Sequence, residues 1–185
     1  MKDEYAIVLD FLHSGHSIDR RATPIAQVIG EINFNVLEVE LKEGHAVKPL
    51  DKVYIGVEKR DIVKSIKRKL KFSELTGNAQ NEIEDALEIL IEKNREKFIE
   101  FFNKSGPVTA RQHQLELLPG IGKKHMWEII DRRKEELFTS FEDIKKRVKL
   151  LPNPKKAIIQ RIINELEGDT KWYLFTSPLK ESDDY

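Results

Sequence analysis

The sequence of 185 residues contains no cysteine, which excludes a disulfide framework and a thiolate metal site. No apolar run approaches the roughly 18 residues that a membrane-spanning helix requires. The amino terminus, MKDEYAIV, mixes charges and lacks the apolar core of a secretory signal peptide. These absences predict a cytoplasmic protein that does not associate with membranes.

The net charge is zero, which taken alone argues against a nucleic-acid ligand. The charges are unevenly distributed, however. Segment 48–75 has 9 basic and 4 acidic residues, a net charge of +5, and segment 111–161 has 13 and 7, a net charge of +6. Segments 1–47, 76–110 and 162–185 are each negative. Because the local field steers an anionic ligand, the two basic segments are the candidate surfaces for nucleic acid.

Residues 1–78 have the pattern of a small β-barrel. Short apolar stretches are separated by turns, and Val36, Val39 and Leu41 alternate with glutamates. The run KPLDKVYIGV resembles the turn and strand of oligonucleotide-binding (OB) barrels. We therefore expect an α+β protein of several domains that begins with an OB-like barrel.

The hydrophobic period changes near residue 79. Apolar residues from Ile83 to Phe102 then recur at steps of three and four, with glutamates between them. This pattern predicts one amphipathic helix of about 25 residues that ends at Lys104. We expect segment 79–105 to connect two domains, and the tail 169–185 to fold back on it through the aromatic residues after Trp172.

The segment 106–168 predicts four shorter helices. Thr109 is a candidate cap for a helix over 110–118, and a second helix is expected over 122–136. Ser140 with Asp143 resembles a capping box for a helix over 141–149. Pro154 suits the first turn of a last helix that ends near Gly168.

An internal repeat lies within this segment. Leu117-Leu118-Pro119 recurs 33 residues later as Leu150-Leu151-Pro152, and a lysine pair follows each copy. Two copies of a helix–turn–helix unit explain the recurrence. The second copy lacks both glycines of the first, so we expect it to act as a structural partner.

The turn of the first copy, LPGIGKK, has the composition of an anion site. Pro119 ends the preceding helix, and the two glycines permit backbone angles with positive φ. Ile121 is expected to point inward, while the amides of the turn and of the next helix point outward to a phosphate. The expected contact residues are Gly120, Ile121, Gly122, Lys123, Lys124 and His125, with Lys155 and Lys156 from the second copy.

These residues resemble the helix-hairpin-helix motif, and the doubled unit resembles its tandem form. The whole chain resembles an uncharacterised archaeal family of predicted RNA-binding proteins, which join an OB-like barrel to a tandem helix-hairpin-helix domain. The resemblance implies a grip on the nucleic-acid backbone that does not read sequence, with RNA favoured over DNA and no cofactor. The alternatives are a DNA-binding accessory protein of repair or recombination, and a module that binds protein partners through the acidic face of helix 80–104.

A second candidate surface is the basic strand over 62–72. Its cations surround Phe72, and Tyr54 and Phe34 are candidate stacking faces for bases. The alternative is that the aromatic residues form the barrel core and the lysines protect an edge strand. The cations of this surface are Lys64, Lys67, Arg68, Lys69 and Lys71.

Trp127, in the helix expected over 122–136, is predicted to be a core residue.

Catalysis and metal binding are not predicted. His13 and His16, with Asp10 and Asp19, lie in a loop without a third ligand at fixed spacing. Lys124 with Glu142 or Asp143 matches the lysine and carboxylate of certain base-excision glycosylases, but the segment leaves no room for a base pocket. For His113 and His125, which flank the turn, a phosphate contact is favoured over a catalytic role.

Overall fold

The computed structural model describes residues 3–15 and 23–178 of the chain. The chain forms two compact units, the first of residues 1–87 with 165–185 and the second of residues 88–164. The limits between the units, at residues 87–88 and 164–165, each fall inside a helix. The sequence placed the domain boundaries after residues 78, 105 and 168. The tail after residue 168 thus belongs to the same unit as the sheet.

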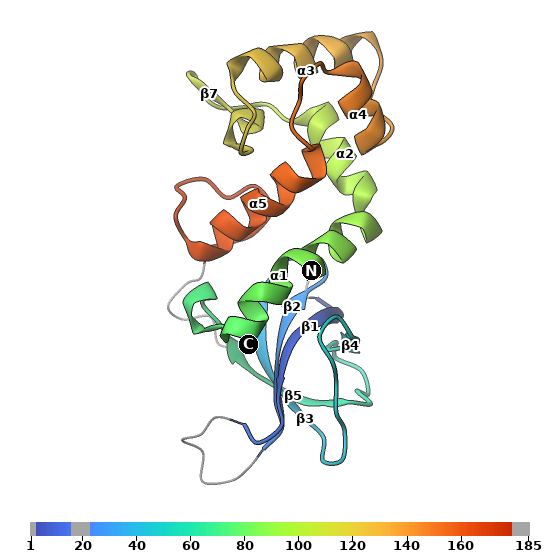
Figure 1. Ribbon diagram of the computed structural model, residues 1–185, viewed down its shortest axis with the longest axis vertical. Coiled ribbons are helices and arrows are strands. Elements are labelled where there is room, and N and C mark those ends of the chain that lie inside the picture. The colour runs from blue at the N-terminus through green and yellow to red at the C-terminus, as the bar shows by residue number, and fades with distance from the viewer. Residues whose placement is uncertain (1–2, 16–22, 179–185) are drawn as a thin grey trace. The chain divides into compact units, whose positions relative to one another are not determined.

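The first unit is built on one curled antiparallel sheet (Figure 1). Its strands are β1 (Tyr5–Leu12), β2 (Ile25–Gly30), β3 (Val36–Leu41), β4 (Lys52–Tyr54) and β5 (Val63–Lys69). Their order is β4-β1-β2-β3-β5, so β4 and β5 are the two edges. The alternating apolar pattern of the first 72 residues therefore correctly predicted strands, and the α+β class is confirmed.

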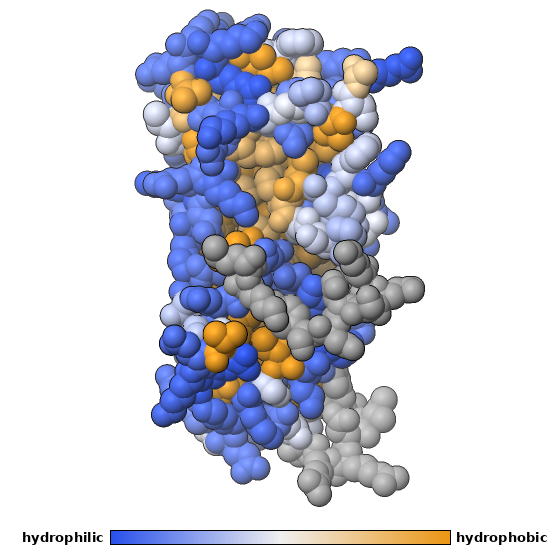
Figure 2. All heavy atoms as spheres, turned by 180° about the vertical axis from the view of Figure 1, so that it is seen from behind, coloured by the Kyte–Doolittle hydropathy of each residue, from blue (hydrophilic) through white to orange (hydrophobic). Residues whose placement is uncertain are grey.

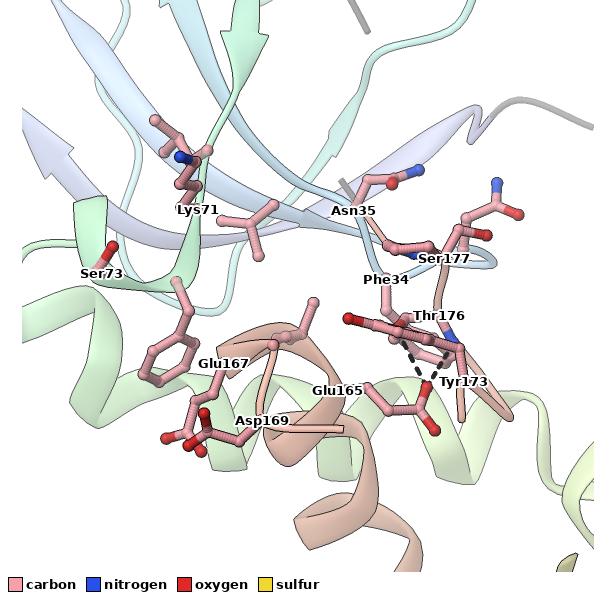
Figure 3. Close-up of a pocket in the computed structure, with 17 residues that line it drawn as sticks. Phe34, Asn35, Lys71, Ser73, Glu165, Glu167, Asp169, Tyr173, Thr176 and Ser177 are labelled. Carbon is pink, nitrogen blue, oxygen red and sulfur yellow. Dashed lines mark hydrogen bonds between the residues drawn. The ribbon is translucent and has the colours of Figure 1, made fainter. Parts of the chain in front are cut away.

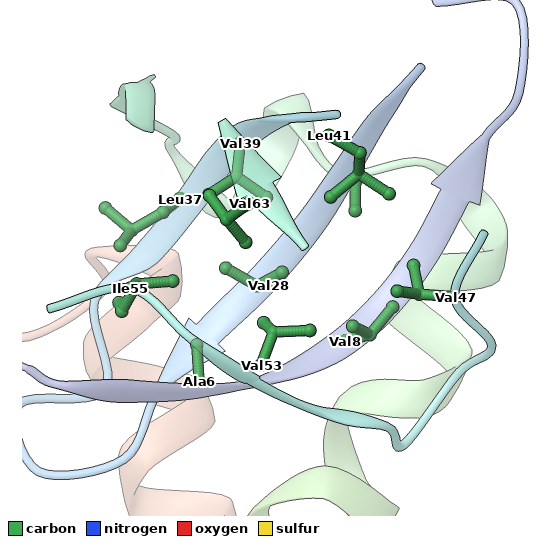
Figure 4. Close-up of a cluster of buried hydrophobic side chains, with 11 residues drawn as sticks. Ala6, Val8, Val28, Leu37, Val39, Leu41, Val47, Val53, Ile55 and Val63 are labelled. Atoms are coloured by element: carbon green, nitrogen blue, oxygen red, sulfur yellow. The ribbon is translucent and has the colours of Figure 1, made fainter. Parts of the chain in front are cut away.

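One hydrophobic core of this unit lies on the concave side of the sheet. An extra residue in β1, between Val8 and Asp10, shifts the register against β2 and bends the strand. The bend lets side chains from all five strands meet in one interior (Figure 4). The cluster consists of Ala6, Val8, Ala26, Val28, Leu37, Val39, Leu41, Val47, Val53, Ile55 and Val63.

The helix α1 (Gly77–Lys93) begins against the sheet. The Thr76 hydroxyl accepts from the Ala79 amide at 3.1 Å, which caps the helix. The buried Gln27 of β2 accepts from the Thr76 amide at 2.9 Å and donates to the Glu74 carbonyl at 3.3 Å. These two bonds attach the start of α1, with the short 3₁₀ turn η1 (Phe72–Glu74), to the strand.

The prediction of a single helix from residue 79 to Lys104 is wrong. The chain forms α1 and then α2 (Arg95–Lys104), with Asn94 between them at φ −107° and ψ 24°. The Asn94 side-chain amide donates to the Leu90 carbonyl at 2.8 Å. The Asn94 side chain thus binds a backbone carbonyl of α1, and the regular series of helical backbone hydrogen bonds is interrupted at this residue. Hydrophobic periodicity does not detect this effect.

The prediction of a helix over 110–118 is also wrong. This stretch forms a small hairpin of β6 (Pro107–Thr109) and β7 (Gln112–His113), followed by the 3₁₀ turn η2 (Gln114–Leu117). Gly106 and Gln114 exchange two hydrogen bonds, since the Gln114 amide donates to the Gly106 carbonyl at 2.9 Å and the Gln114 side chain accepts from the Gly106 amide at 2.8 Å. The Thr109 hydroxyl accepts from the Arg111 amide at 3.2 Å and closes the hairpin turn instead of capping a helix.

The other three helices form where the sequence predicts them. They are α3 (Lys123–Glu135), α4 (Phe141–Arg147) and α5 (Pro154–Glu167). The Ser140 hydroxyl accepts from the Asp143 amide at 3.0 Å, which confirms this residue as the cap of α4. Over residues 3–15 and 23–178, no helix combines the length and the apolar character needed to cross a membrane.

Candidate nucleic-acid interface

The turn between η2 and α3 contains the predicted phosphate-binding residues. Leu118 has an extended backbone, φ −78° and ψ 126°, as expected for a residue before proline. The Ile121 amide donates to the Leu118 carbonyl at 3.1 Å, and the Ile121 side chain is buried. The prediction that Ile121 fixes the turn to the core is confirmed.

The two glycines of the turn have different roles. Gly120 has φ +81°, and a Cβ built there would lie 3.0 Å from Cγ of Pro152. Gly122 has φ −91° and ψ −176°, an extended conformation that any residue adopts, and a Cβ there would meet nothing within 4 Å. The prediction that both glycines need positive φ is therefore wrong for Gly122.

Gly122 is the N-cap of α3, and it offers no side chain to the amides that open the helix. The amides of Gly122, Lys123, Lys124 and His125 have no acceptor among the residues that the structure describes. The first amides of a helix also lie at the positive end of the helix dipole. The turn therefore presents unpaired donors suited to an anion, although the Ile121 amide is used by the fold.

The two lysines after Gly122 add positive charge to these amides. Lys123 and Lys124 are both exposed, and neither forms an ion pair within the described part of the chain. His125 is half-buried. This lysine pair therefore faces solvent without a counter-charge in the described part of the chain.

The second copy of the repeat has a different arrangement. The Asn153 side chain accepts from the amides of Lys155 at 3.0 Å and Lys156 at 3.2 Å, so the start of α5 is already capped. The Lys155 ammonium lies 3.2 Å from Glu88 and 3.1 Å from Glu92. Burial lowers the pKa of Lys155, but the hydrogen bonds to Glu92 and Glu88 outweigh this and raise it.

The second copy therefore supplies few groups to a ligand. Its helix amides are occupied and Lys155 is neutralised, which leaves the exposed Lys156 as the predicted contact without an ion pair in the described structure. The ion pairs of Lys155 with Glu88 and Glu92 also occupy part of the acidic face of α1. This face is the one that the alternative hypothesis assigned to a protein partner. The first copy therefore has more unpaired groups available to a ligand than the second.

The two turns nevertheless pack against each other. Gly120 of the first turn lies against Pro152 of the second, and the buried Arg161 of α5 donates to the Leu117 carbonyl at 3.3 Å. The positive φ of Gly120 and the absence of its Cβ allow this approach. The second copy thus holds the first turn in place, as the sequence suggested.

Trp127 is 58% exposed, so its prediction as a core residue is wrong. Met126 and Ile129 are the buried residues of α3, and Trp127 follows Met126 onto the solvent side. Sequence spacing alone did not identify which apolar residues of α3 face inward.

On the face of the molecule shown in Figure 2, hydrophobic residues gather in patches between hydrophilic ones.

The cations of β5 are largely neutralised by glutamates. Lys64 and Lys67 lie 2.6 and 3.5 Å from Glu40, and Arg68 pairs with Glu38 at 3.6 Å and with Glu74. The hydrogen bond from Lys64 is the main cause that lowers the pKa of Glu40. Lys69 is half-buried and Lys71 is exposed. The expected second basic surface therefore has much less free charge than its composition implies.

The aromatic residues of the sheet unit do not form the expected stacking platform. Phe34 is only 1% exposed, with φ 55°. Tyr54 packs edge-on against Tyr5 with ring centroids 5.2 Å apart. Phe72 is half-buried. Phe34 thus fits the alternative in which the aromatic residues belong to the core, while Tyr54 and Phe72 are only partly buried.

One carboxylate of the glycosylase comparison, Asp143, has structural partners. The Asp143 carboxylate accepts from the Thr139 amide at 3.1 Å and from Arg147 at 3.3 Å. His113 also caps η2, because its ring nitrogen Nδ1 accepts from the Leu115 amide at 3.1 Å. Burial is the main cause that lowers the pKa of His113. The structure therefore gives Asp143 and His113 local roles in the fold.

The loop considered for a metal falls only partly within the described residues, because His16 and Asp19 lie outside them. The Asp10 carboxylate accepts from the Thr76 hydroxyl at 2.6 Å and from the Phe11 amide at 2.9 Å. Over residues 3–15 and 23–178, no group of three or more His, Asp or Glu is arranged to hold a metal ion.

A cavity of about 500 Å³ in the first unit was not predicted from the sequence. It is lined by the turn 33–36, the segment 70–73, the end of α5 and the tail 173–178 (Figure 3). The buried Glu165 accepts from the amides of Leu174 at 2.7 Å, Phe175 at 3.0 Å and Thr176 at 2.8 Å. This carboxylate fixes the tail beside the cavity.

The cavity has the size of a small-molecule site but a mixed lining. Phe72 and Tyr173 contribute aromatic rings, while Lys71 and the carboxylates of Glu167 and Asp169 contribute opposite charges (Figure 3). The tail was expected from its aromatic residues to pack on a helix; the amides of Leu174, Phe175 and Thr176 bind Glu165 of α5, while Trp172 exchanges hydrogen bonds with Thr170 within the tail. The residues around the cavity come from four separate segments, which no local motif connects.

Comparison with known proteins identifies relatives over nearly the whole chain. A family model described as a protein of unknown function, DUF655, matches residues 2–177. The uncharacterized protein MJ0038 of Methanocaldococcus jannaschii is 38% identical over 175 residues, which are 94% of this chain and 79% of that protein. The crystal structure of Af1531 from Archaeoglobus fulgidus, of the same family model, is 47% identical, with a TM-score of 0.88 over 95% of this chain and 100% of that chain. Both organisms are archaea, in agreement with the expected archaeal family, and the chain belongs to the DUF655 family of proteins of unknown function.

Proposed function

We propose that this protein binds nucleic acid, RNA in preference to DNA, by holding the phosphate backbone at the turn from Gly120 to His125. One observation supports the proposal most directly. Four successive amides without acceptors in the described structure lie beside two exposed lysines without ion pairs. Backbone amides and lysines are the groups that proteins direct at phosphates, and such contacts do not read base sequence.

The arrangement around this turn supports a tandem helix-hairpin-helix reading of the second unit. In the second copy, α4 and α5 are joined by a turn that touches the first turn at Gly120. In the first copy the 3₁₀ turn η2 stands where the first helix of the hairpin is expected. The proposal therefore depends on the turn and on α3, and less on the element before them.

The sheet supports an OB-like reading of the first unit. Five antiparallel strands in a non-sequential order, with open edges at β4 and β5, suit a partly open Greek-key barrel. This likeness and the resemblance to predicted RNA-binding proteins are the reasons for favouring RNA. Because Lys64, Lys67 and Arg68 are ion-paired, the basic strand has a minor part in the proposal.

The test is a charge reversal of both lysines, Lys123→Glu with Lys124→Glu. Binding of labelled single- and double-stranded RNA and DNA is measured by fluorescence anisotropy at three salt concentrations. The expected result is weaker binding and a smaller salt dependence. The slope of log K against log salt should fall by about 1.4 for single strands and about 1.8 for duplexes, if each lysine contacts one phosphate.

A matched control separates a local contact from a general change of charge. Lys145 and Lys146 of α4 are also exposed and also have no ion pair in the described structure. Reversing both makes the same change in net charge within the same unit, and should reduce binding much less. Absence of binding by the unaltered protein, or an equal loss in both double variants, would contradict the proposal.

A further inference from the structure

Trp127 is an exposed aromatic residue beside the proposed phosphate contacts. The residue is 58% exposed, and its ring makes no ring or cation–π contact with the residues that the structure describes. A tryptophan buries a large apolar area when it packs, so exposure forgoes stabilisation of the fold. Single exposed apolar residues are common, however, and exposure by itself does not assign a role.

The position of Trp127 on α3 gives its exposure a functional meaning. It follows Lys123 by four residues and Lys124 by three, and residues at these spacings are neighbours on one side of a helix. An indole ring flanked by two unpaired cations combines a stacking surface with contacts for phosphates. This is the composition that proteins use to bind single strands without reading sequence.

We propose that Trp127 is a stacking platform for an unpaired base, so that the turn and α3 bind single-stranded nucleic acid or the unpaired loops of a folded RNA. The inference rests on the proposed function and adds the class of ligand. In a duplex both faces of each base are covered by neighbours, so the indole ring has no free face to stack on. In a single strand, the base next to a held phosphate turns onto the ring.

The test compares Trp127→Ala and Trp127→Phe with the unaltered protein. The ligands are a labelled single-stranded RNA, its duplex, and an abasic strand of the same length that keeps the sugar-phosphate backbone. Loss of one stacked base weakens binding by about 5- to 150-fold on alanine substitution. We expect this loss in Trp127→Ala with single-stranded RNA, a smaller loss in Trp127→Phe, and no difference with the abasic strand or the duplex.

Fluorescence gives an independent measurement, because the chain has 2 tryptophans. In a Trp172→Phe background, Trp127 is the sole indole. Stacking should quench its emission when single-stranded RNA is added, and the abasic strand should not. Leu137→Ala is the matched control, since this residue is also exposed (60%) and lies in the same unit.

The outcomes separate the inference from the proposal beneath it. Trp127→Phe keeps an aromatic ring at this 58% exposed position, so this variant should unfold near the temperature of the unaltered protein. If no oligonucleotide binds the unaltered protein, the proposed function fails. If single strands bind but Trp127→Ala binds them equally and no quenching occurs, nucleic-acid binding stands and the stacking role of Trp127 is refuted.

Discussion

Replacing Gly122 with asparagine tests whether the open start of α3 binds the ligand. The change copies an arrangement that the protein already contains, because Asn153 caps α5 by accepting from the amides of Lys155 and Lys156 at 3.0 and 3.2 Å. Gly122 has an extended backbone, and its missing Cβ faces open space. An asparagine therefore fits at Gly122 without strain, and its side-chain oxygen can accept from the amides of the same helical positions, Lys124 and His125.

Two effects of opposite sign follow from this substitution. The new cap should stabilise the fold by a few tenths of a kcal/mol, which is the usual difference between asparagine and glycine at an N-cap. The same cap occupies two amides proposed to hold a phosphate, and a hydrogen bond to a charged group contributes about 1.5–3 kcal/mol. Loss of even one such bond predicts at least about tenfold weaker binding of RNA.

The assay combines urea unfolding with equilibrium binding of a labelled single-stranded RNA. Gly122→Ala is the control, because alanine is a poor cap and leaves the amides free. It should be slightly less stable than the unaltered protein and should bind within a few-fold of it. A Gly122→Asn protein that gains stability and binds RNA as tightly as before would refute the role of the amides.

Three further substitutions test the structure around the turns and the sheet. Gly120→Ala should lower the free energy of unfolding in urea by about 1–2 kcal/mol, because φ is +81° and Pro152 lies 3.0 Å from the added Cβ; an unchanged midpoint would contradict this. Leu150→Asn should raise the free energy of unfolding by up to about 1 kcal/mol, because Leu150 is 90% exposed and has φ 57°, a backbone conformation that asparagine adopts more readily than leucine. A destabilised Leu150→Asn protein would show a packing role of Leu150 instead. Glu40 has a pKa lowered chiefly by the hydrogen bond from Lys64, so its contribution is present above the unfolded value near 4.5 and is lost as pH falls through the lower folded value. Glu40→Gln should therefore flatten the acid limb of a plot of melting temperature against pH, and an unchanged limb would contradict this.

The features predicted correctly from the sequence are those that local patterns determine. Strand alternation identified the sheet, the cap at Ser140 identified α4, and Pro154 in the first turn identified α5. The failures have identifiable physical causes. Asn94 interrupts a helix through its own side chain, and Gln114 binds Gly106 to form a hairpin where helical periodicity predicts a helix.

The candidate site was predicted in part for a similar reason. The turn motif identified the amides and the lysines, because a proline and two glycines determine backbone direction locally. Burial and ion pairing depend on other segments. The exposure of Trp127, the pairing of Lys64 with Glu40 and the cavity beside Glu165 all follow from contacts between residues far apart in the sequence.

The difference between the two repeats follows from the N-cap residue and from the neighbours of each helix. The N-cap of α3 is glycine, whereas Asn153 precedes α5, and the asparagine side chain accepts from the amides of Lys155 and Lys156. Counted from these caps, Lys124 and Lys155 occupy the same helical position. Lys155 lies beside Glu88 and Glu92 of α1, while Lys124 has no carboxylate partner in the described part of the chain. The cap and the tertiary neighbours thus explain why two similar sequences give one candidate binding turn and one supporting turn.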